Sequence, residues 1–182
     1  MAKSGLLACV VLLTFPAVHA QEPSAPPPTA PPVAASPAPA AATATSVDLV
    51  NTTPKGQLRN RYTDDDAPIV EAGRKLYFRY GCNGCHGGMG GGGMCPPLTN
   101  DIWVYGGDDD TLFRLVTLGS DELQNRGYTR KGSENVVGPM PPMGAIVTTD
   151  DELWRIFAFI RANYHGAPES KFGEPAEAAP PP

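Results

Sequence analysis

The stretch GCNGCHGGMGGGGMCPPLTN, residues 81–100, concentrates reactive side chains in a chain of 182 residues. It holds three of the four cysteines, one of the three histidines and two of the five methionines. Cys82 and Cys85 stand three positions apart, so one helical turn presents both thiols on the same face, and His86 follows directly. Two thiols and an imidazole in this order indicate the binding of a metal or a cofactor.

The order C-x-x-C-H is the pattern by which a c-type haem is attached. Two thiols on one turn can add to the two vinyl groups at one edge of the porphyrin, and the following histidine can ligate the iron. A disulfide, a thioredoxin-like redox pair and half of a zinc site are the competing interpretations. The zinc site would depend on Cys95 and His165, and the redox pair needs a βαβ context that the sequence lacks. We therefore predict one covalently bound haem c.

The beginning of the chain has the composition of an export signal. Lys3 precedes the apolar residues 6–18, which end in a small-residue cleavage pattern. This pattern predicts a signal peptide over residues 1–20, cut after Ala20, and a periplasmic protein. The apolar run is too short to cross a bilayer, and no later run approaches the ~20 apolar residues of a spanning helix, so we predict no transmembrane anchor.

Proline-rich segments lie at both ends of the predicted mature chain. Residues 21–46 are nearly all Pro, Ala, Thr and Ser, which predicts a disordered tether. Residues 171–182 end in three prolines and predict a similar tail. One small domain remains over residues 47–170, and a core of that size gains stability from a covalent staple or a cofactor.

The formal net charge of the chain is −5, and loss of the predicted signal peptide removes Lys3 and no acid, which changes it to −6. An acidic chain is a poor partner for nucleic acid, because phosphates require a basic face. The acids stand in runs at 64–66, 108–110 and 150–152. A calcium site is one interpretation, but no run has calcium-loop spacing, and 150–152 stands where a helix N-terminus favours negative charge.

A sixth iron ligand would come from a methionine or a second histidine. Met140 and Met143 lie in a loop that three prolines stiffen, and such a loop can hold one thioether in place. We expect Met140 to be the ligand, because a full loop separates it from the next helix; Met143 is the alternative, and core packing is the competing role of both. Met89 and Met94 lie too near the attachment motif, and His165 is expected at the surface.

Together these motifs resemble a class I cytochrome c over about residues 67–165. In that family one helix leads into C-x-x-C-H, a proline loop carries the methionine ligand, and a last helix crosses the first. The counterpart of the first helix is residues 70–77, with Gly73 at the crossing and Tyr77 packed beside it. The resemblance implies an all-α class I cytochrome c fold of three to five helices around one haem.

Two further helices are indicated by the spacing of apolar residues. A middle helix is predicted over residues 110–118 and a C-terminal helix from Asp150 to about Tyr164. The predicted inward side chains are, in the middle helix, Leu112, Leu115 and Val116 and, in the last helix, Leu153, Ile156, Phe157, Ile160 and Tyr164.

Residues 96–98, Pro-Pro-Leu, match the G-P-x-L element of the family, with Pro96 at the proline and Leu98 at the leucine. The resemblance implies that the Pro96 carbonyl accepts the second N–H of His86, which orients the imidazole. Cys95 stands where the family usually has glycine. Three interpretations of Cys95 stay open: a small buried residue, the link of a disulfide-bonded dimer and a redox-sensitive thiol.

Residues 98–105 are similar to the segment after the haem motif in cytochrome cL-like proteins. Those are acidic periplasmic proteins that accept electrons from quinone-dependent (PQQ) methanol and alcohol dehydrogenases. The similarity implies such a dehydrogenase as the electron donor, with a terminal oxidase or another cytochrome as the acceptor. Trp103 and Tyr105 either donate hydrogen bonds to the haem propionates or only pack in the core.

Residues 119–137 form a polar insertion that contains Arg126, Arg130 and Lys131. The segment either flanks the exposed haem edge and helps to dock a partner, or is a solvated loop.

An iron with both an imidazole and a thioether bound has no open position for a substrate. The expected function is therefore that of a periplasmic one-electron carrier rather than an enzyme. Two alternatives remain. An open-site haem protein would be a peroxidase-like enzyme or a gas sensor, and a haem subunit would be tethered to a larger oxidoreductase complex.

Overall fold

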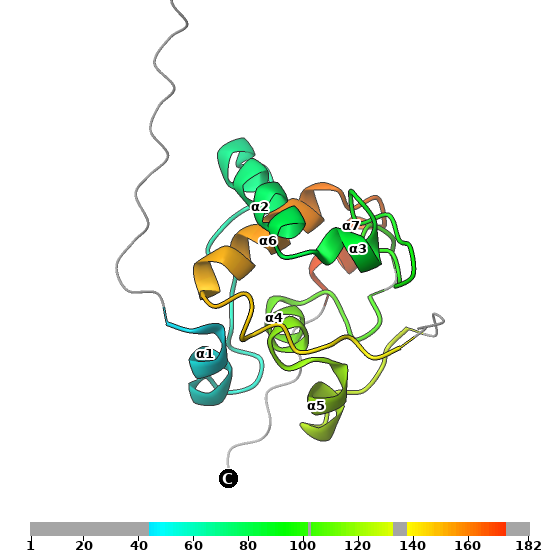
Figure 1. The fold of residues 1–182 in the computed structure, drawn as a ribbon. Coiled ribbons are helices and arrows are strands. Elements are labelled where there is room, and N and C mark those ends of the chain that lie inside the picture. The colour runs from blue at the N-terminus through cyan, green and yellow to red at the C-terminus, as the bar shows by residue number, and fades with distance from the viewer. Residues whose placement is uncertain (1–43, 102, 133–137, 174–182) are drawn as a thin grey trace, which may run out of the picture. The chain divides into compact units, whose positions relative to one another are not determined.

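A computed structural model describes residues 44–101, 103–132 and 138–173 of the chain. The predicted signal peptide, the tether up to residue 43, residues 133–137 of the insertion and residues 174–182 of the tail lie outside this description. The described residues contain no β-strand, which confirms the predicted all-α class. Within them the chain forms seven helices (Figure 1): α1 (Ser46–Thr52), α2 (Ala67–Arg79), α3 (Cys82–His86), α4 (Asp109–Leu118), α5 (Ser120–Asn125), α6 (Asp150–Ala162) and α7 (Pro168–Phe172).

Helices α2 and α6 cross in direct contact, and Gly73 lies at the crossing (Figure 1). A Cβ atom on Gly73 would stand 1.9 Å from the carbonyl oxygen of Arg155, so only glycine lets the two backbones approach this closely. The fully buried ring of Tyr77 packs beside the crossing, 5.2 Å between centroids from the ring of Phe159. The helix crossing predicted at Gly73 is confirmed.

Acidic and hydroxyl side chains determine where the three longest helices begin. Asp66, Asp108 and Thr149 each accept a backbone N–H from the first turn of α2, α4 and α6, respectively. The acids at 150–152 occupy the first turn of α6, as predicted, where the helix dipole favours negative charge. No group of three or more His, Cys, Asp or Glu side chains among the described residues could hold a metal ion. Members of the acidic runs act as helix caps, as Asp66 and Asp108 do, and as ion-pair partners, as Asp110 and Asp151 do.

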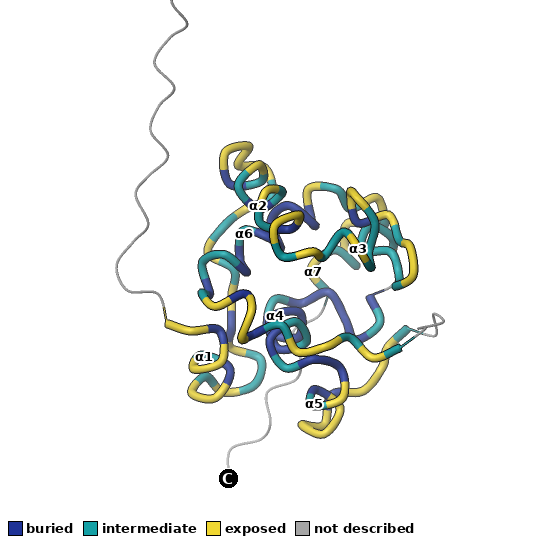
Figure 2. The backbone as a smooth tube through the Cα atoms, in the orientation of Figure 1, coloured by how far each residue is buried: buried dark blue, intermediate teal, exposed yellow. Residues whose placement is uncertain are grey.

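Helix α6 is the most deeply buried element and lies in the centre of the core (Figure 2). Its predicted stripe is buried except for Tyr164, which follows the helix and is half-buried. Trp154 and Phe159 are buried as well, because Trp154 packs against Phe113 of α4, 4.4 Å between ring centroids, and Phe159 packs against Tyr77 of α2. In α4 the predicted inward residues are buried or half-buried, and Phe113, which the sequence analysis missed, is fully buried.

Three short helices lie where the sequence predicted none. Helix α1 starts at Ser46, whose buried hydroxyl donates to the carbonyl of Val147, so the ordered chain begins before the predicted boundary. Helix α5 occupies the start of the predicted polar insertion. Helix α7 runs across the predicted boundary at residue 170, and its Lys171 pairs with Asp64. None of the described helices is long and apolar enough to cross a membrane.

Arg114, which forms a buried ion pair within α4, also joins α4 to the end of α1. The guanidinium of Arg114 pairs with the carboxylate of Asp110 at 2.9 Å, and both side chains are at most 5% exposed. The same guanidinium donates to the carbonyl of Val50, in the last turn of α1, and to those of Thr53 and Pro54, which directly follow the helix. Arg114 therefore acts as the C-terminal cap of a helix that precedes it by more than sixty residues.

Candidate haem-binding site

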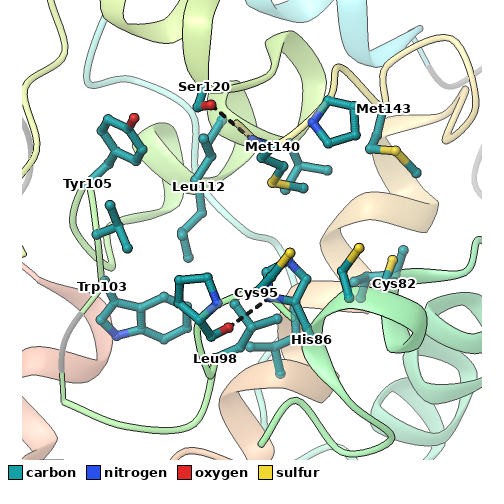
Figure 3. A pocket seen from close by; sticks show the side chains of 18 of the residues that line it. Cys82, His86, Cys95, Leu98, Trp103, Tyr105, Leu112, Ser120, Met140 and Met143 are labelled. Carbon is teal, nitrogen blue, oxygen red and sulfur yellow. Dashed lines mark hydrogen bonds between the residues drawn. The ribbon is translucent and has the colours of Figure 1, made fainter. Parts of the chain in front are cut away.

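A cavity of about 430 Å³ lies between α3, α4, α6 and the proline loop (Figure 3). Apolar side chains of α4 and α6 form much of its wall. All residues singled out from the sequence for cofactor binding line this cavity: Cys82, Cys85, His86, Pro96, Leu98, Trp103, Tyr105, Met140 and Met143. The fold thus gathers residues that lie up to 61 positions apart in the sequence.

The two thiols lie on one short helical turn at the edge of the cavity. Gly81, with φ of 74°, reverses the chain after α2, and only a residue without Cβ adopts this conformation easily. Helix α3 follows at once and presents Cys82 and Cys85 as free, half-buried thiols. Burial raises the pKa of Cys82 to about 11, so this thiol keeps its proton at neutral pH.

His86 is held by one hydrogen bond, from its Nδ1–H to the carbonyl of Pro96, at 2.9 Å. This is the bond that the resemblance implied. It leaves Nε2 unprotonated, and an unprotonated ring nitrogen is the form that ligates a metal. Burial lowers the pKa of His86, and the bond to Pro96 opposes that shift only in part. The imidazole is therefore neutral and fixed in orientation.

The glycine-rich loop folds back onto α3. The carbonyls of Cys85 and His86 accept the N–H groups of Cys95 and Gly92 at 3.0 and 2.9 Å. Gly92 has φ of 96°, whereas Cys95 has an ordinary negative φ. The glycine of the family is therefore not required at the position of Cys95, and the loop still brings Pro96 to His86.

Met140 lies across the cavity from His86 (Figure 3). Ser120, next to the end of α4, binds both backbone polar groups of Met140. The Ser120 N–H donates to the Met140 carbonyl and the Ser120 hydroxyl accepts the Met140 N–H, each at 3.0 Å. Met143 lies on the side of Cys82 and packs against the main apolar core. The two methionines thus differ in setting, one facing the imidazole and one belonging partly to the core.

The aromatic residues after the glycine loop form one wall. Trp103 stacks on Tyr164, 5.9 Å between ring centroids, and its indole nitrogen lies beside Gly107. Tyr105 is buried in a second apolar cluster with Leu123. Both rings pack in the wall of the cavity, and the hydrogen bonds to the haem propionates stay a prediction.

The residues that the sequence analysis set aside lie away from the cavity. Met89 and Met94 are 51% and 60% exposed, and His165 is exposed and donates its backbone N–H to Thr99. Arg130, which belongs to the predicted insertion, lines the cavity. Ser120 was missed, and no signal in the sequence indicates its role, because its partner Met140 lies twenty residues away.

The donor set and the cavity fit a haem c. Two free thiols stand one turn apart, a neutral imidazole is fixed beside them, and a thioether stands opposite. The polar atoms that line the cavity are few, so the cavity suits a large apolar ring.

Comparison with known proteins agrees with this geometry. Residues 68–160 match the family model described as "Cytochrome C oxidase, cbb3-type, subunit III". The cbb3-type cytochrome c oxidase subunit CcoP of Azospirillum sp. (strain B510) is 36% identical over 64 residues, which cover 34% of this chain and 22% of that protein. The subunit CcoP of Rubrivivax gelatinosus is 28% identical over 107 residues, 58% of this chain and 29% of that protein.

The chain spans only about a quarter of the length of these curated relatives. Among solved structures, cytochrome CL from the marine methylotrophic bacterium Methylophaga aminisulfidivorans MPT is similar, with a TM-score of 0.48 and 25% sequence identity. That match covers 72% of this chain and 76% of the other.

Proposed function

This chain belongs to the cytochrome c family described as "Cytochrome C oxidase, cbb3-type, subunit III", whose members carry electrons on a covalently bound haem c, and we propose that His86 and Met140 are its axial ligands. Cys82 and Cys85 form the two thioether bonds. The class I cytochrome c resemblance predicted from the sequence is confirmed at the level of the family. The protein is an electron-transfer protein, not an enzyme.

The observation that carries the proposal is the position of Met140 opposite His86 (Figure 3). If His86 and Met140 both held the iron, a substrate would have no open position there. When bound, haem c supplies an Fe(III)/Fe(II) couple that takes up and releases one electron. The apolar walls from α4 and α6 exclude water, and the Pro96 carbonyl keeps His86 in place through both redox states.

The partners follow from two different kinds of support. The acidic charge and the cytochrome cL-like segment at 98–105 support a quinone-dependent methanol or alcohol dehydrogenase as the donor. The family match supports an oxidase as the acceptor, either directly or through another cytochrome. The leader-like residues 1–20 support a periplasmic location, which is also where both partners would meet the protein.

A second candidate function is that of a haem subunit in a larger oxidase complex. The specific observation in its favour is that the curated relatives are subunits of cbb3-type oxidases and are several times longer than the matched region. Size measurement in a native extract separates the two functions. A free carrier sediments at somewhat less than the 19.2 kDa of the full chain, because the predicted signal peptide is removed, and a subunit sediments with its complex.

The axial ligands are tested by the optical spectrum of the oxidised protein from a haem-loading host. Methionine sulfur on low-spin ferric haem gives a weak absorption band in the red. We expect this band in the wild type and in Met143→Ala, and its loss in Met140→Ala. If Met143→Ala loses the band instead, Met143 is the ligand. A high-spin wild type that binds carbon monoxide readily would make the protein an open-site haem protein.

A further inference from the structure

Cys95 is in contact with one of the two attachment cysteines. Its backbone N–H donates to the carbonyl of Cys85 at 3.0 Å, and burial together with the neighbouring Cys85 thiol raises the pKa of Cys95. Both side chains line the cavity, and both are free thiols. The attachment site therefore holds three thiols, whereas two vinyl groups need only two.

The glycine loop keeps Cys95 in this position. Gly93 lies so close to α3 that a Cβ atom would stand 2.9 Å from the carbonyl oxygen of Cys85, and its N–H donates to the carbonyl of Cys95. The N–H of Gly92 donates to the carbonyl of His86. Since only nine residues separate Cys85 from Cys95, closing a loop between them carries a small entropic cost.

We propose that Cys95 is a third thiol of the attachment site, which forms a disulfide with Cys85 in the chain without haem and so keeps Cys85 out of the attachment reaction. The inference rests on the proposed attachment of haem through Cys82 and Cys85. A disulfide within the C-x-x-C pair would oxidise both attachment cysteines, whereas the proposed disulfide leaves Cys82 as a free thiol.

The redox step is a thiol–disulfide exchange. A disulfide oxidant, such as oxidised glutathione, takes the two electrons from the thiols of Cys85 and Cys95 and leaves as two thiols, while the sulfur–sulfur bond forms in the chain. A dithiol reductant reverses the step and becomes a disulfide itself. Cys85 can add to a vinyl group only after its thiol has been regenerated. Its sulfur then bonds to one vinyl carbon, and its proton goes to the other carbon of the same vinyl group. Haem attachment then leaves Cys95 as a free thiol.

Two chemical cleavages distinguish the possible pairings. Hydroxylamine cuts the Asn83–Gly84 bond, the one Asn-Gly bond of the sequence, between Cys82 and Cys85. Cyanogen bromide cuts after Met89 and Met94, between Cys85 and Cys95. The haem-free chain is exported by a host without a haem-attachment system, oxidised with glutathione disulfide, alkylated and cleaved by both reagents without reduction. Mass spectrometry then identifies the fragments that stay linked.

We expect residues 84–89 to be linked to residues 95–140, with about tenfold more of this pair than of any other. The matched control Cys95→Ser should link the fragment ending at Asn83 to residues 84–89 instead. A wild-type chain in which that Cys82–Cys85 linkage or a Cys82–Cys95 linkage dominates, or in which no disulfide forms, overturns the inference.

A separate measurement keeps this test independent of the proposed function. In the haem-loaded protein, maleimide labelling should mark Cys95 and leave Cys82 and Cys85 unmarked. If the loaded protein instead shows Cys82 or Cys85 as a free thiol, the proposed attachment is wrong, whatever the disulfide map of the haem-free chain. If Cys95 is unlabelled while both attachment cysteines are bound, Cys95 has another partner and the inference is overturned.

Discussion

Ser120 determines the position of Met140 by binding both backbone polar groups of that residue. Its hydroxyl accepts the N–H of Met140 and its own N–H donates to the carbonyl of Met140, each at 3.0 Å. Gly119, with φ of 78°, turns the chain so that Ser120 can reach the loop, and a Cβ atom there would stand 2.8 Å from the Met140 carbonyl oxygen. Because both backbone polar groups of Met140 are bound, the loop holds the thioether in a fixed position.

Ser120→Ala should loosen Met140 without changing the ligand itself. The variant loses one hydrogen bond, a change of about 1 kcal/mol, which corresponds to roughly fivefold easier displacement of the thioether. Added imidazole should therefore replace Met140 at about a fifth of the concentration needed for the wild type, as followed by the red absorption band. The control is Thr117→Val, because the buried Thr117 hydroxyl has no hydrogen-bond partner in the described chain. Equal imidazole affinities for Ser120→Ala and the wild type would contradict this role.

At the scale of residues, the sequence allowed the prediction of groups whose chemistry depends on neighbours in the chain. The spacing of Cys82, Cys85 and His86 indicated the attachment motif, and Pro96 lies only ten positions beyond His86. Ser120 could not be predicted, because its role depends on a loop twenty residues away. The contact between Cys85 and Cys95 was equally hidden, since it depends on how a flexible run of glycines folds.

At the scale of elements, the crossing of α2 and α6 places the attachment motif against the apolar core. Helix α2 ends two residues before Gly81, so the orientation of α2 on α6 also fixes that of α3. The crossing is close because Gly73 lacks a side chain, and Tyr77 reaches from the same face to donate its hydroxyl to the carbonyl of Gly87 at 2.8 Å.

Gly73→Ala should force α2 and α6 apart. The new methyl group would meet the Arg155 carbonyl oxygen at 1.9 Å, far inside contact distance, so we expect a loss of at least about 2 kcal/mol in the free energy of unfolding. Urea unfolding of the haem-loaded protein measures the loss. Gly84→Ala is the matched control, because no atom lies within 4 Å of its new Cβ and its helix gains up to about 1 kcal/mol. Similar stabilities of the two variants would exclude a tight crossing.

Arg114→Met should release α1 from α4. The substitution leaves the carboxylate of Asp110, which is fully buried, without its charged partner, and such changes cost about 3–5 kcal/mol. Arg126→Met removes a similar side chain from an exposed pair with Glu122 and should cost less than about 1 kcal/mol. Urea unfolding again measures both changes. A loss for Arg114→Met as small as that for Arg126→Met would mean that the buried network contributes little.

The long helices could be predicted because each carries an apolar stripe at helical spacing and a recognisable cap. The predicted and observed bounds of the middle helix differ by one residue, and the last helix starts at Asp150 as expected. The short helices α1, α5 and α7 have no such signal, because seven residues or fewer show too few turns of a pattern. Their positions depend on tertiary contacts, such as the cap that Arg114 gives to α1.

At the scale of the whole molecule, acidic side chains are part of the packing as well as the source of net charge. Burial alone would raise the pKa of Asp110, but hydrogen bonds from Arg114, from backbone N–H groups and from Tyr128 lower it overall. The pKa of Asp151 is lowered in the same way. Burial alone would raise this pKa, but the hydrogen bonds from Arg155 and Tyr62 lower it overall. Both carboxylates are therefore stabilised in their charged form by folding.

Stability should therefore fall in acid. A carboxyl whose pKa is lowered by folding contributes stability above its unfolded pKa of about 4, and the contribution is lost as the pH falls through the folded value. We expect the urea midpoint to be constant from pH 7 to about pH 5 and to drop below about pH 4. Asp151→Asn should show a smaller drop, and the haem spectrum recorded in parallel shows when His86 leaves the iron. A midpoint that stays constant down to pH 3 would contradict the expected linkage.

The hydrogen bonds that hold Thr45 and Ser46 in place have a mechanical consequence for the methionine loop. Thr45 pairs with Thr149, and the Ser46 hydroxyl bonds to Val147, at the exit of the loop that carries Met140 and Met143. Tension on the chain ahead of Thr45 would be borne first by these few bonds, and only afterwards by the packing of α1. A force applied ahead of Thr45 is therefore transmitted directly to the methionine loop. A partner that pulls on this part of the chain would displace Met140 before it disturbed the core.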